Sequence, residues 1–185
     1  MRVIAGVYKG RKLKSPPSMQ VRPTSDRLRE TLFNVIAPRV QESRFFDLCA
    51  GSGAVGIEAL SRGASYVTFV DRSRRSCQLI EANLELCRVP EEQREIYCSE
   101  VTEFLRQTRD VTWDIIFFDP PYKQDYLKTL EIIGMKKLLS GLLIVEHHHK
   151  NPLPEISGNL RRMRVLKQGD SALSFYAADA RISPC

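Results

Sequence analysis

A tetrapeptide in the second half of the chain, Asp119-Pro120-Pro121-Tyr122, carries residue types suited to reactions of a weakly nucleophilic amine. An exocyclic amine of a nucleobase is a poor nucleophile because its lone pair is delocalised into the ring. The Asp119 carboxylate and the Pro120 carbonyl can accept hydrogen bonds from the N–H groups of the amine. These bonds hold the amine and let its nitrogen pyramidalise. The prolines restrict the turn, and Tyr122 can stack on a base. We therefore predict Asp119, Pro120 and Tyr122 as catalytic residues; the alternative is an ordinary Asp-Pro turn.

A second motif runs from Asp47 to Gly56 and contains Gly51-x-Gly53-x-x-Gly56 directly after an apolar run. Glycines permit tight turning of the backbone and close approach of a ligand. By spacing alone the motif matches a dinucleotide-binding fingerprint, and Asp71, which closes the next apolar run, could hold a ribose hydroxyl. The motif therefore predicts a site for a nucleoside-containing cofactor, either NAD or S-adenosylmethionine.

The position of Asp47 favours S-adenosylmethionine over NAD. A carboxylate just before the glycines would repel a pyrophosphate, whereas it suits the α-amino group of a bound amino acid. Glu100 begins a predicted helix and could contact the adenine, although an acid there is also favoured by the helix dipole. The predicted cofactor-binding residues are Asp47, Ala50, Gly51, Ser52, Gly53, Asp71, Glu100 and Asp119. Direct methyl transfer from a sulfonium needs neither a cysteine nucleophile nor a metal.

Apolar runs alternate with amphipathic stretches from Phe45 onward, which is typical of βαβ units and a parallel sheet. Strands are predicted at 45–49, 66–70, 95–98, 113–118 and 142–146, and helices near 54–62, 73–87, 100–107 and 126–139. Residues 161–168 and 172–178, joined by Gly169-Asp170, indicate an antiparallel hairpin. The predicted fold is α/β and Rossmann-like, of the class I S-adenosylmethionine-dependent methyltransferase type, with a mostly parallel seven-stranded sheet.

The first quarter of the chain carries the excess positive charge. Residues 1–44 hold 10 Lys/Arg and 3 Asp/Glu, whereas residues 45–185 hold 18 and 19. We predict that 1–44 form a basic extension and 45–185 the core. The extension would contain a hairpin of 3–7 and 11–13, a mobile loop at 15–18, and a helix over 24–37 capped by Thr24. Such asymmetry favours a polyanionic partner, although a solvated basic surface is the commoner explanation.

Composition excludes several other classes. Five cysteines without a CxxC pair argue against a disulfide framework and a zinc site, and favour buried, reduced thiols. No apolar run reaches the roughly 20 residues of a membrane span, and no signal peptide is visible, so a cytoplasmic location is expected. Side chains at His147-His148-His149 alternate along a predicted strand, so the three should not reach one metal.

Several motifs together resemble the bacterial small-subunit rRNA guanine-N2 methyltransferases of the RsmD type, over nearly the whole chain. Besides the two motifs above, the similar segments are Gly6-x-x-Lys9-Gly10-Arg11-x-Leu13, Arg22-Pro23-Thr24-x-Asp26-Arg27-x-Arg29-Glu30, Leu32-Phe33-Asn34, Glu58-Ala59-Leu60-Ser61-Arg62-Gly63 and Gly169-Asp170 before Leu173-Ser174-Phe175-Tyr176. This chain departs from the family pattern at Gln168, where an aromatic residue is common, and at Glu100, where Asp or Asn is frequent.

The resemblance implies methylation of guanine N2 in small-subunit (16S) rRNA, within an assembled or assembling 30S ribosomal particle, with S-adenosylmethionine as the methyl donor. Arginines of the second segment would lie near the active-site mouth and clamp phosphates. The residues predicted to bind RNA are Lys9, Arg11, Lys12, Arg22, Arg27 and Arg29. A monomer is expected.

Three other functions are weighed against this one. Related Asp/Asn-Pro-Pro motifs serve amino methylation of DNA, of other RNAs and of protein glutamine. A non-catalytic nucleic-acid-binding module could retain the cofactor pocket, but the intact Asp47, Asp71 and Asp119 argue against it. An NAD-dependent oxidoreductase lacks an evident hydride-transfer group here.

Overall fold

The computed structural model describes residues 1–16, 26–109, 111–121 and 126–178. By its internal contacts the chain forms two units, Met1–Glu100 and Val101–Cys185, and each is described by itself. The proposed division into a 1–44 extension and a 45–185 core stays a prediction. Predicted features at Arg22, Thr24, Tyr122 and the 17–18 part of the proline-rich loop lie outside the described residues.

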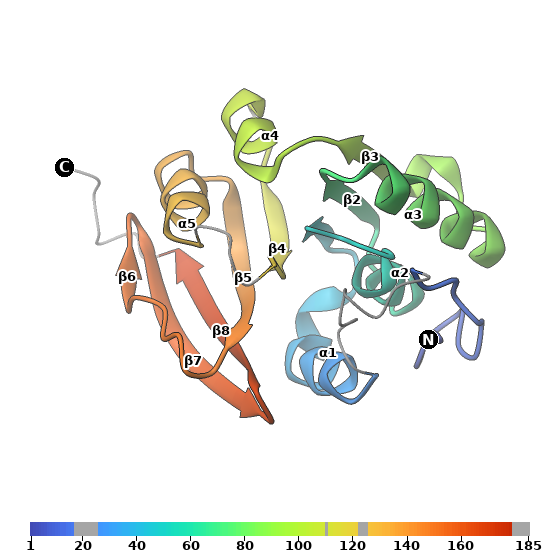
Figure 1. The fold of residues 1–185 in the computed structure, drawn as a ribbon, viewed down its shortest axis with the longest axis horizontal. Helices are drawn as coiled ribbons and strands as arrows, with labels where there is room; N and C mark the ends of the chain where they lie inside the picture. The colour runs from blue at the N-terminus through green and yellow to red at the C-terminus, as the bar shows by residue number, and fades with distance from the viewer. Residues whose placement is uncertain (17–25, 110, 122–125, 179–185) are drawn as a thin grey trace. The chain divides into compact units, whose positions relative to one another are not determined.

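The first unit contains a three-stranded parallel layer with helices packed against it (Figure 1). Its strands are β1 (Arg44–Leu48), β2 (Tyr66–Asp71) and β3 (Arg94–Cys98), with β2 pairing to both neighbours. Its helices are α1 (Asp26–Val40), α2 (Ala54–Ser61), α3 (Arg74–Cys87) and the 3₁₀ turn η1 (Glu91–Gln93). β1 and β2 are almost wholly buried, as expected for parallel strands covered on both faces.

The second unit joins parallel and antiparallel strands in the order β4-β5-β8-β7-β6. β4 (Trp113–Phe118) and β5 (Leu139–His148) are parallel, and α4 (Val101–Gln107) and α5 (Tyr126–Met135) belong to the same unit. β7 (Leu160–Gln168) and β8 (Ser171–Ala178) form the predicted antiparallel hairpin, and β8 also pairs with β5. The structure adds one strand to the predicted seven, β6 (Ile156–Ser157), which pairs with the start of β7.

The N-terminal segment differs from the predicted hairpin. Its described residues contain one isolated bridge, between Arg2 and Lys12, and turns between them. The segment is nevertheless held firmly, because Val3 and Leu13 are buried in the core. Backbone amides of Ile4 and Ala5 donate to the Glu58 carboxylate at 2.8 and 3.0 Å, which attaches the segment to α2.

The cysteines are less uniform than expected. Cys87 is buried, Cys49 and Cys77 are half-buried, and Cys98 is exposed at the end of β3, which contradicts the prediction that all are buried. Cys98 is exposed because β3 is the outer strand of this layer, none of whose residues is fully buried. Among the described residues, no helix combines the length and hydrophobicity needed to cross a membrane.

Candidate functional site

The glycine motif forms a loop of left-handed backbone between β1 and α2. Cys49, Gly51 and Gly53 have φ values of 61°, 57° and 74°, in the region that glycine tolerates best. A Cβ atom on Gly56 would lie 2.3 Å from the Phe69 ring, so this glycine is required for α2 to pack on β2. Backbone conformation thus favours glycine at positions 51 and 53, whereas close packing on Phe69 requires it at position 56.

Asp47, at the end of β1, holds the start of α2. Its Oδ2 accepts a hydrogen bond from the Gly56 amide at 2.8 Å. Gly53 occupies the N-cap position of α2 and has no side chain to cap the helix, so Asp47 satisfies one of the amide donors that every helix start leaves open. The residue predicted to contact a cofactor therefore also shapes the loop.

Burial gives Asp47 an unusual ionisation. Its side chain is 2% exposed, and desolvation raises the pKa of its carboxyl to about 7. The Gly56 amide opposes this rise, whereas the negative charge of Asp71 adds to it. Two carboxylates that repel each other beside a glycine loop favour a cationic ligand, because a positive group nearby would stabilise the ionised form of Asp47.

Asp71 organises the same loop from β2. Its Oδ2 accepts from the Gly51 amide at 2.9 Å and its Oδ1 from the Ser73 amide at 2.8 Å. A carboxylate oxygen has more than one acceptor position, so both oxygens can still receive hydroxyl donors of a ligand. Asp71 thus fixes the glycine loop and the β2–α3 turn with respect to each other.

Glu100, the third predicted acidic contact, sits immediately before α4 and is exposed. Its Oε1 lies 3.5 Å from Nη1 of Arg72, and both side chains are more than half exposed. An exposed ion pair of this kind contributes little to stability. Glu100 is accessible to a ligand, and its pairing with Arg72 is weak enough to be exchanged.

Asn83 is a site residue that sequence analysis missed. This fully buried side chain accepts from the Lys14 amide at 2.8 Å, and its Nδ2 lies 3.1 Å from the Lys14 carbonyl oxygen and 2.9 Å from that of Ser52. It therefore links the N-terminal segment to the glycine loop. The available signal was an amide within the apolar stripe of α3, whose buried positions are Ile80, Asn83, Leu84 and Cys87.

The predicted RNA-binding residues separate into two groups. Lys9, Lys12 and Arg27 are exposed. Arg11 is half-buried, lies 5.4 Å above the Tyr8 ring and donates to the Leu86 carbonyl at 2.9 Å.

Arg29 is the clear correction, because it is fully buried and cannot meet RNA on the surface. It pairs with Asp26 at 3.0 Å, donates to the Arg2 carbonyl and approaches Glu58 at 3.8 Å. Burial lowers the pKa of its guanidinium, whereas Asp26 and Glu58 raise it. Arg29 lies on the inner side of α1 and is a structural residue that joins α1, α2 and the N-terminal segment. Counting charged residues in the sequence does not show which of them are buried.

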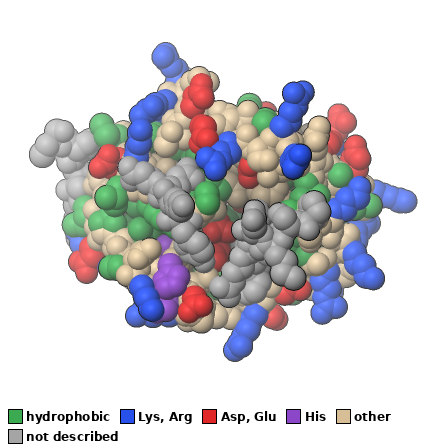
Figure 2. Space-filling model, in the orientation of Figure 1, with side chains coloured by type: hydrophobic (Ala, Val, Ile, Leu, Met, Phe, Trp, Pro, Cys, Tyr) green, Lys and Arg blue, Asp and Glu red, His purple; other side chains and the backbone are tan. Residues whose placement is uncertain are grey.

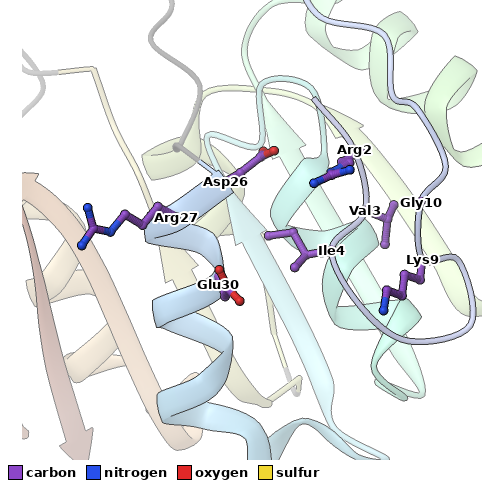
Figure 3. A pocket seen from close by; sticks show the side chains of 8 residues that line it. All are labelled: Arg2, Val3, Ile4, Lys9, Gly10, Asp26, Arg27 and Glu30. Carbon is purple, nitrogen blue, oxygen red and sulfur yellow. The ribbon is translucent and has the colours of Figure 1, made fainter.

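A pocket of about 320 Å³ lies between the N-terminal segment and α1 (Figure 3). Glu30 and Asp26 line it from the helix, and Figure 3 shows Arg27 directed away from the other labelled side chains. The remaining lining residues are Arg2, Val3, Ile4, Lys9 and Gly10. With three basic and two acidic residues, the pocket presents mixed charge, although residues 1–44 carry an excess of positive charge.

In the second unit, the predicted catalytic turn follows β4. Asp119 is half-buried, Pro120 buried and Pro121 exposed. The turn begins directly after Phe118, which is opposite Val145 in the parallel β4–β5 register. In open α/β sheets ligands bind beyond the carboxyl ends of the strands, and within its own unit this turn occupies such a position, as the glycine loop does in the other unit.

Comparison with known proteins shows similarity over nearly the full length. A family model described as conserved hypothetical protein 95 matches residues 1–177. Ribosomal RNA small subunit methyltransferase D of Escherichia coli (strain K12) is 35% identical over 184 residues, covering 98% of this chain and 91% of that protein. YlbH of Bacillus subtilis (strain 168) is 37% identical over 181 residues, with 95% and 98% covered. The solved structure of yhhF from Escherichia coli has a TM-score of 0.86 at 34% identity, with 97% and 98% covered.

Proposed function

Because the chain belongs to the family described as conserved hypothetical protein 95, and has a small-subunit rRNA methyltransferase D among its full-length relatives, we propose that it transfers a methyl group from S-adenosylmethionine to N2 of a guanine in small-subunit rRNA. Its fold is that of the class I methyltransferases, with parallel strands followed by an antiparallel pair. The observation that carries the cofactor assignment is the pair Asp47 and Asp71 around a left-handed glycine loop.

The cofactor contacts follow from the chemistry of the loop. S-adenosylmethionine supplies an electrophilic methyl group on a sulfonium and also carries an ammonium, so its charge complements two neighbouring carboxylates. Asp47 faces the ammonium, Asp71 receives the ribose hydroxyls, and Glu100 borders the adenine. The backbone of Ala50, Gly51, Ser52 and Gly53 forms the wall, and a Cβ atom on Gly51 would approach only the Cys49 carbonyl, at 4.0 Å, which shows open space on that side.

Asp119 and Pro120 provide the acceptors for the target amine in this proposal. The half-buried carboxylate of Asp119 and the backbone carbonyl of Pro120 accept hydrogen bonds from the two N–H groups of the amine. These bonds orient the nitrogen lone pair toward the methyl group. Asp119 also borders the cofactor, and Tyr122 stacks on the guanine. As the new N–C bond forms, the bond between the methyl group and the sulfonium sulfur would break and S-adenosylhomocysteine would leave. The amine would then release its extra proton to solvent, and no metal is needed in the step.

We assign four residues to contacts with the RNA backbone: Lys9, Lys12, Arg27 and Arg22. Arg11 and Arg29 instead stabilise the elements that carry these residues. The substrate is the rRNA in an assembled or assembling 30S particle, and the enzyme acts in the cytoplasm as a monomer. The rRNA substrate follows the family, and the RNA contacts follow the exposed basic residues of the first unit. The particle, the location and the monomeric state are expectations from the sequence.

Methyl transfer from labelled S-adenosylmethionine tests the proposal. Purified protein is incubated with naked small-subunit rRNA, small ribosomal subunits, DNA and a glutamine-containing protein substrate, and labelled nucleosides are separated. We expect N2-methylguanosine from rRNA or from the particle. Label in DNA or protein would replace the substrate assignment, and cofactor binding without transfer to any acceptor would favour a non-catalytic binding module.

The Asp119 acceptor role makes a sharper prediction. Asp119→Ala should lower kcat at least a hundredfold while changing the S-adenosylmethionine Kd by only a few-fold, because removal of a positioned acceptor acts mainly in the transition state. Asp114→Asn is the control for loss of a negative charge, since Asp114 is an exposed carboxylate on β4, the strand that precedes Asp119. Single-turnover methyl transfer and calorimetry measure the two quantities. A kcat for Asp119→Ala within a few-fold of the parent would eliminate the role.

A further inference from the structure

Two of the three adjacent histidines come together with Asp170 at the end of β5. His147 is separate, since its ring is buried and its Nε2 lies 2.8 Å from the Ser174 hydroxyl of β8. His148 is the last residue of β5 and His149 lies in the following turn, so the alternation expected of a strand ends between them. Their rings stack with centroids 4.9 Å apart. Figure 2 shows histidine side chains at the surface beside basic and acidic ones.

Backbone pairing brings Asp170 to the same place. In the antiparallel β5–β8 register His148 is opposite Ser171, and the His149 amide donates to the Asp170 carbonyl at 2.9 Å. One potential ligand atom from each of His148, His149 and Asp170 lies within 4.8 Å of the other two. Small side-chain rotations would bring these atoms to the separations of a coordination sphere, in which metal–ligand distances are about 2.0–2.2 Å.

The hydrogen bonds of the rings fit metal coordination. Nδ1 of His149 lies 3.1 Å from the Asp170 carbonyl oxygen. Because a carbonyl can only accept, Nδ1 carries the proton and the lone pair is on Nε2. Metal-binding histidines are commonly held by such a bond from the other ring nitrogen. Nδ1 of His148 accepts from the Lys150 amide at 3.1 Å, so a metal at this nitrogen would replace that hydrogen bond.

We propose that His148, His149 and Asp170 form a binding site for a divalent transition-metal cation, of which Zn²⁺ is the reference case. Two imidazoles and one carboxylate suit Zn²⁺, Co²⁺ and Ni²⁺ better than Mg²⁺ or Ca²⁺, which prefer oxygen ligands only. The half-buried rings and the exposed carboxylate leave solvent access for water to complete the sphere. The ion would tie the end of β5 to the β7–β8 turn.

The site is distinct from the methyl-transfer chemistry but lies near it within the second unit. His148 follows Val145, the residue opposite Phe118, by three positions along β5. The cluster therefore lies at the carboxyl end of β5, next to the carboxyl end of β4, which Asp119 follows. Its existence does not depend on the proposed function, because the binding experiment uses neither RNA nor S-adenosylmethionine.

Titration of the full-length, tag-free protein with Zn²⁺ and with Co²⁺ tests the site. Calorimetry should give one Zn²⁺ per chain, and Co²⁺ should produce visible absorption bands with histidine ligation. Asp170→Asn and His149→Ala should each weaken Zn²⁺ binding at least tenfold, because each removes or neutralises one of the three ligands.

Glu131→Gln is the control for general charge loss, because Glu131 is an exposed carboxylate on α5 of the same unit. It should bind Zn²⁺ as the parent does. Asp170→Asn keeps the size and shape of the side chain in the turn. It therefore still tests the site if His149→Ala does not fold. Circular dichroism shows whether each variant is folded. The proposal is overturned if the parent binds no Zn²⁺, or if Asp170→Asn binds it with the affinity of the parent.

Discussion

The ionisation of Asp47 connects burial to ligand choice. An empty site keeps part of this carboxyl protonated near neutral pH, because its pKa is about 7. A ligand ammonium pairs only with the ionised form. Cofactor binding to this residue is therefore coupled to the loss of a proton.

We predict that S-adenosylmethionine affinity rises with pH up to about 7 and then levels, because below its pKa the ionised fraction of Asp47 falls about tenfold per pH unit. Asp47→Asn should bind more weakly at pH 8 and lose this dependence between about pH 5.5 and 7. Calorimetry at several pH values measures it. An unchanged pH profile in Asp47→Asn would show that another group titrates.

The same ionisation has the opposite effect on the stability of the empty protein. A carboxyl whose folded pKa is raised stabilises the folded state at acid pH, and that contribution is lost progressively as pH rises from about 4 to about 7. At pH 8 without cofactor, Asp47→Asn should thus melt a few degrees above the parent, since about 1 kcal/mol moves the Tm of a domain of this size by roughly 2–4 °C. This advantage should shrink as pH falls from about 7 and should disappear below about pH 4, the ordinary pKa of an aspartic acid.

At the scale of elements, the N-terminal segment is positioned by its contact with the end of α2. The Val7 amide donates to the Ser61 carbonyl at 2.8 Å, and the Tyr8 amide to the Ser61 hydroxyl at 2.9 Å. Gly6 lies so close that a Cβ atom would be 1.7 Å from the Ser61 carbonyl oxygen. Close approach at Gly6 is therefore what places Lys9 and its neighbours.

Gly6→Ala should weaken RNA binding at least tenfold and leave the S-adenosylmethionine Kd within a few-fold, because the clash displaces the basic turn but not the glycine loop. Gly10→Ala is a matched control. Both glycines have left-handed φ, 80° and 83°, but a Cβ on Gly10 meets nothing within 4 Å. Filter binding compares the two variants; equal losses would attribute the effect to backbone conformation alone.

Asn83 transmits the position of this segment to the glycine loop. Asn83→Ala leaves polar groups of Lys14 and Ser52 without their partner, and unpaired buried groups cost about 1–3 kcal/mol. We expect the Kd of both S-adenosylmethionine and RNA to rise several-fold. Ser61→Ala, which removes an anchor of the segment without touching the loop, should raise only the RNA Kd. An unaltered cofactor Kd in Asn83→Ala would exclude the coupling.

At the scale of the whole molecule, the basic charge of residues 1–44 has two uses. Part is inside, where Arg29 and Glu58 stabilise the packing of α1 and α2, and part is outside at Lys9, Lys12 and Arg27. Val3 and Leu13 contribute to the core, so truncating this segment would disturb the fold as well as the charge. Point substitutions of exposed lysines separate these effects.

Lys9→Gln/Lys12→Gln should weaken RNA binding and reduce its salt dependence. For single-stranded RNA, each lost phosphate contact should lower the slope of log K against log salt by about 0.7. Lys137→Gln/Lys167→Gln, which removes two exposed lysines of the second unit, is the charge-matched control. Equal slopes for the two double variants would place the RNA elsewhere.

Sequence alone determined the strand and helix order, because apolar periodicity reports directly which segments are buried on which faces. The predicted strand 113–118 is β4 itself, and the helix at 73–87 differs from α3 by one residue. The glycine loop and its acids were also visible, since their chemistry follows from residue type and spacing. Contacts between residues that are distant in the sequence but close in the folded protein could not be predicted.

Only the tertiary structure showed that Arg29 is buried among acidic groups, that Asn83 connects Lys14 to Ser52, and that His148 and His149 meet Asp170. The Asn83 contacts and the pairing of His149 with Asp170 join residues at least 20 positions apart, and the meeting of His148 and His149 depends on where β5 ends. Arg29 and Asp26 are close in sequence, but Arg29 is buried only because α2 and the N-terminal segment cover it. The pKa of Asp47 also required the structure, because desolvation is a property of the surrounding atoms and not of the residue itself.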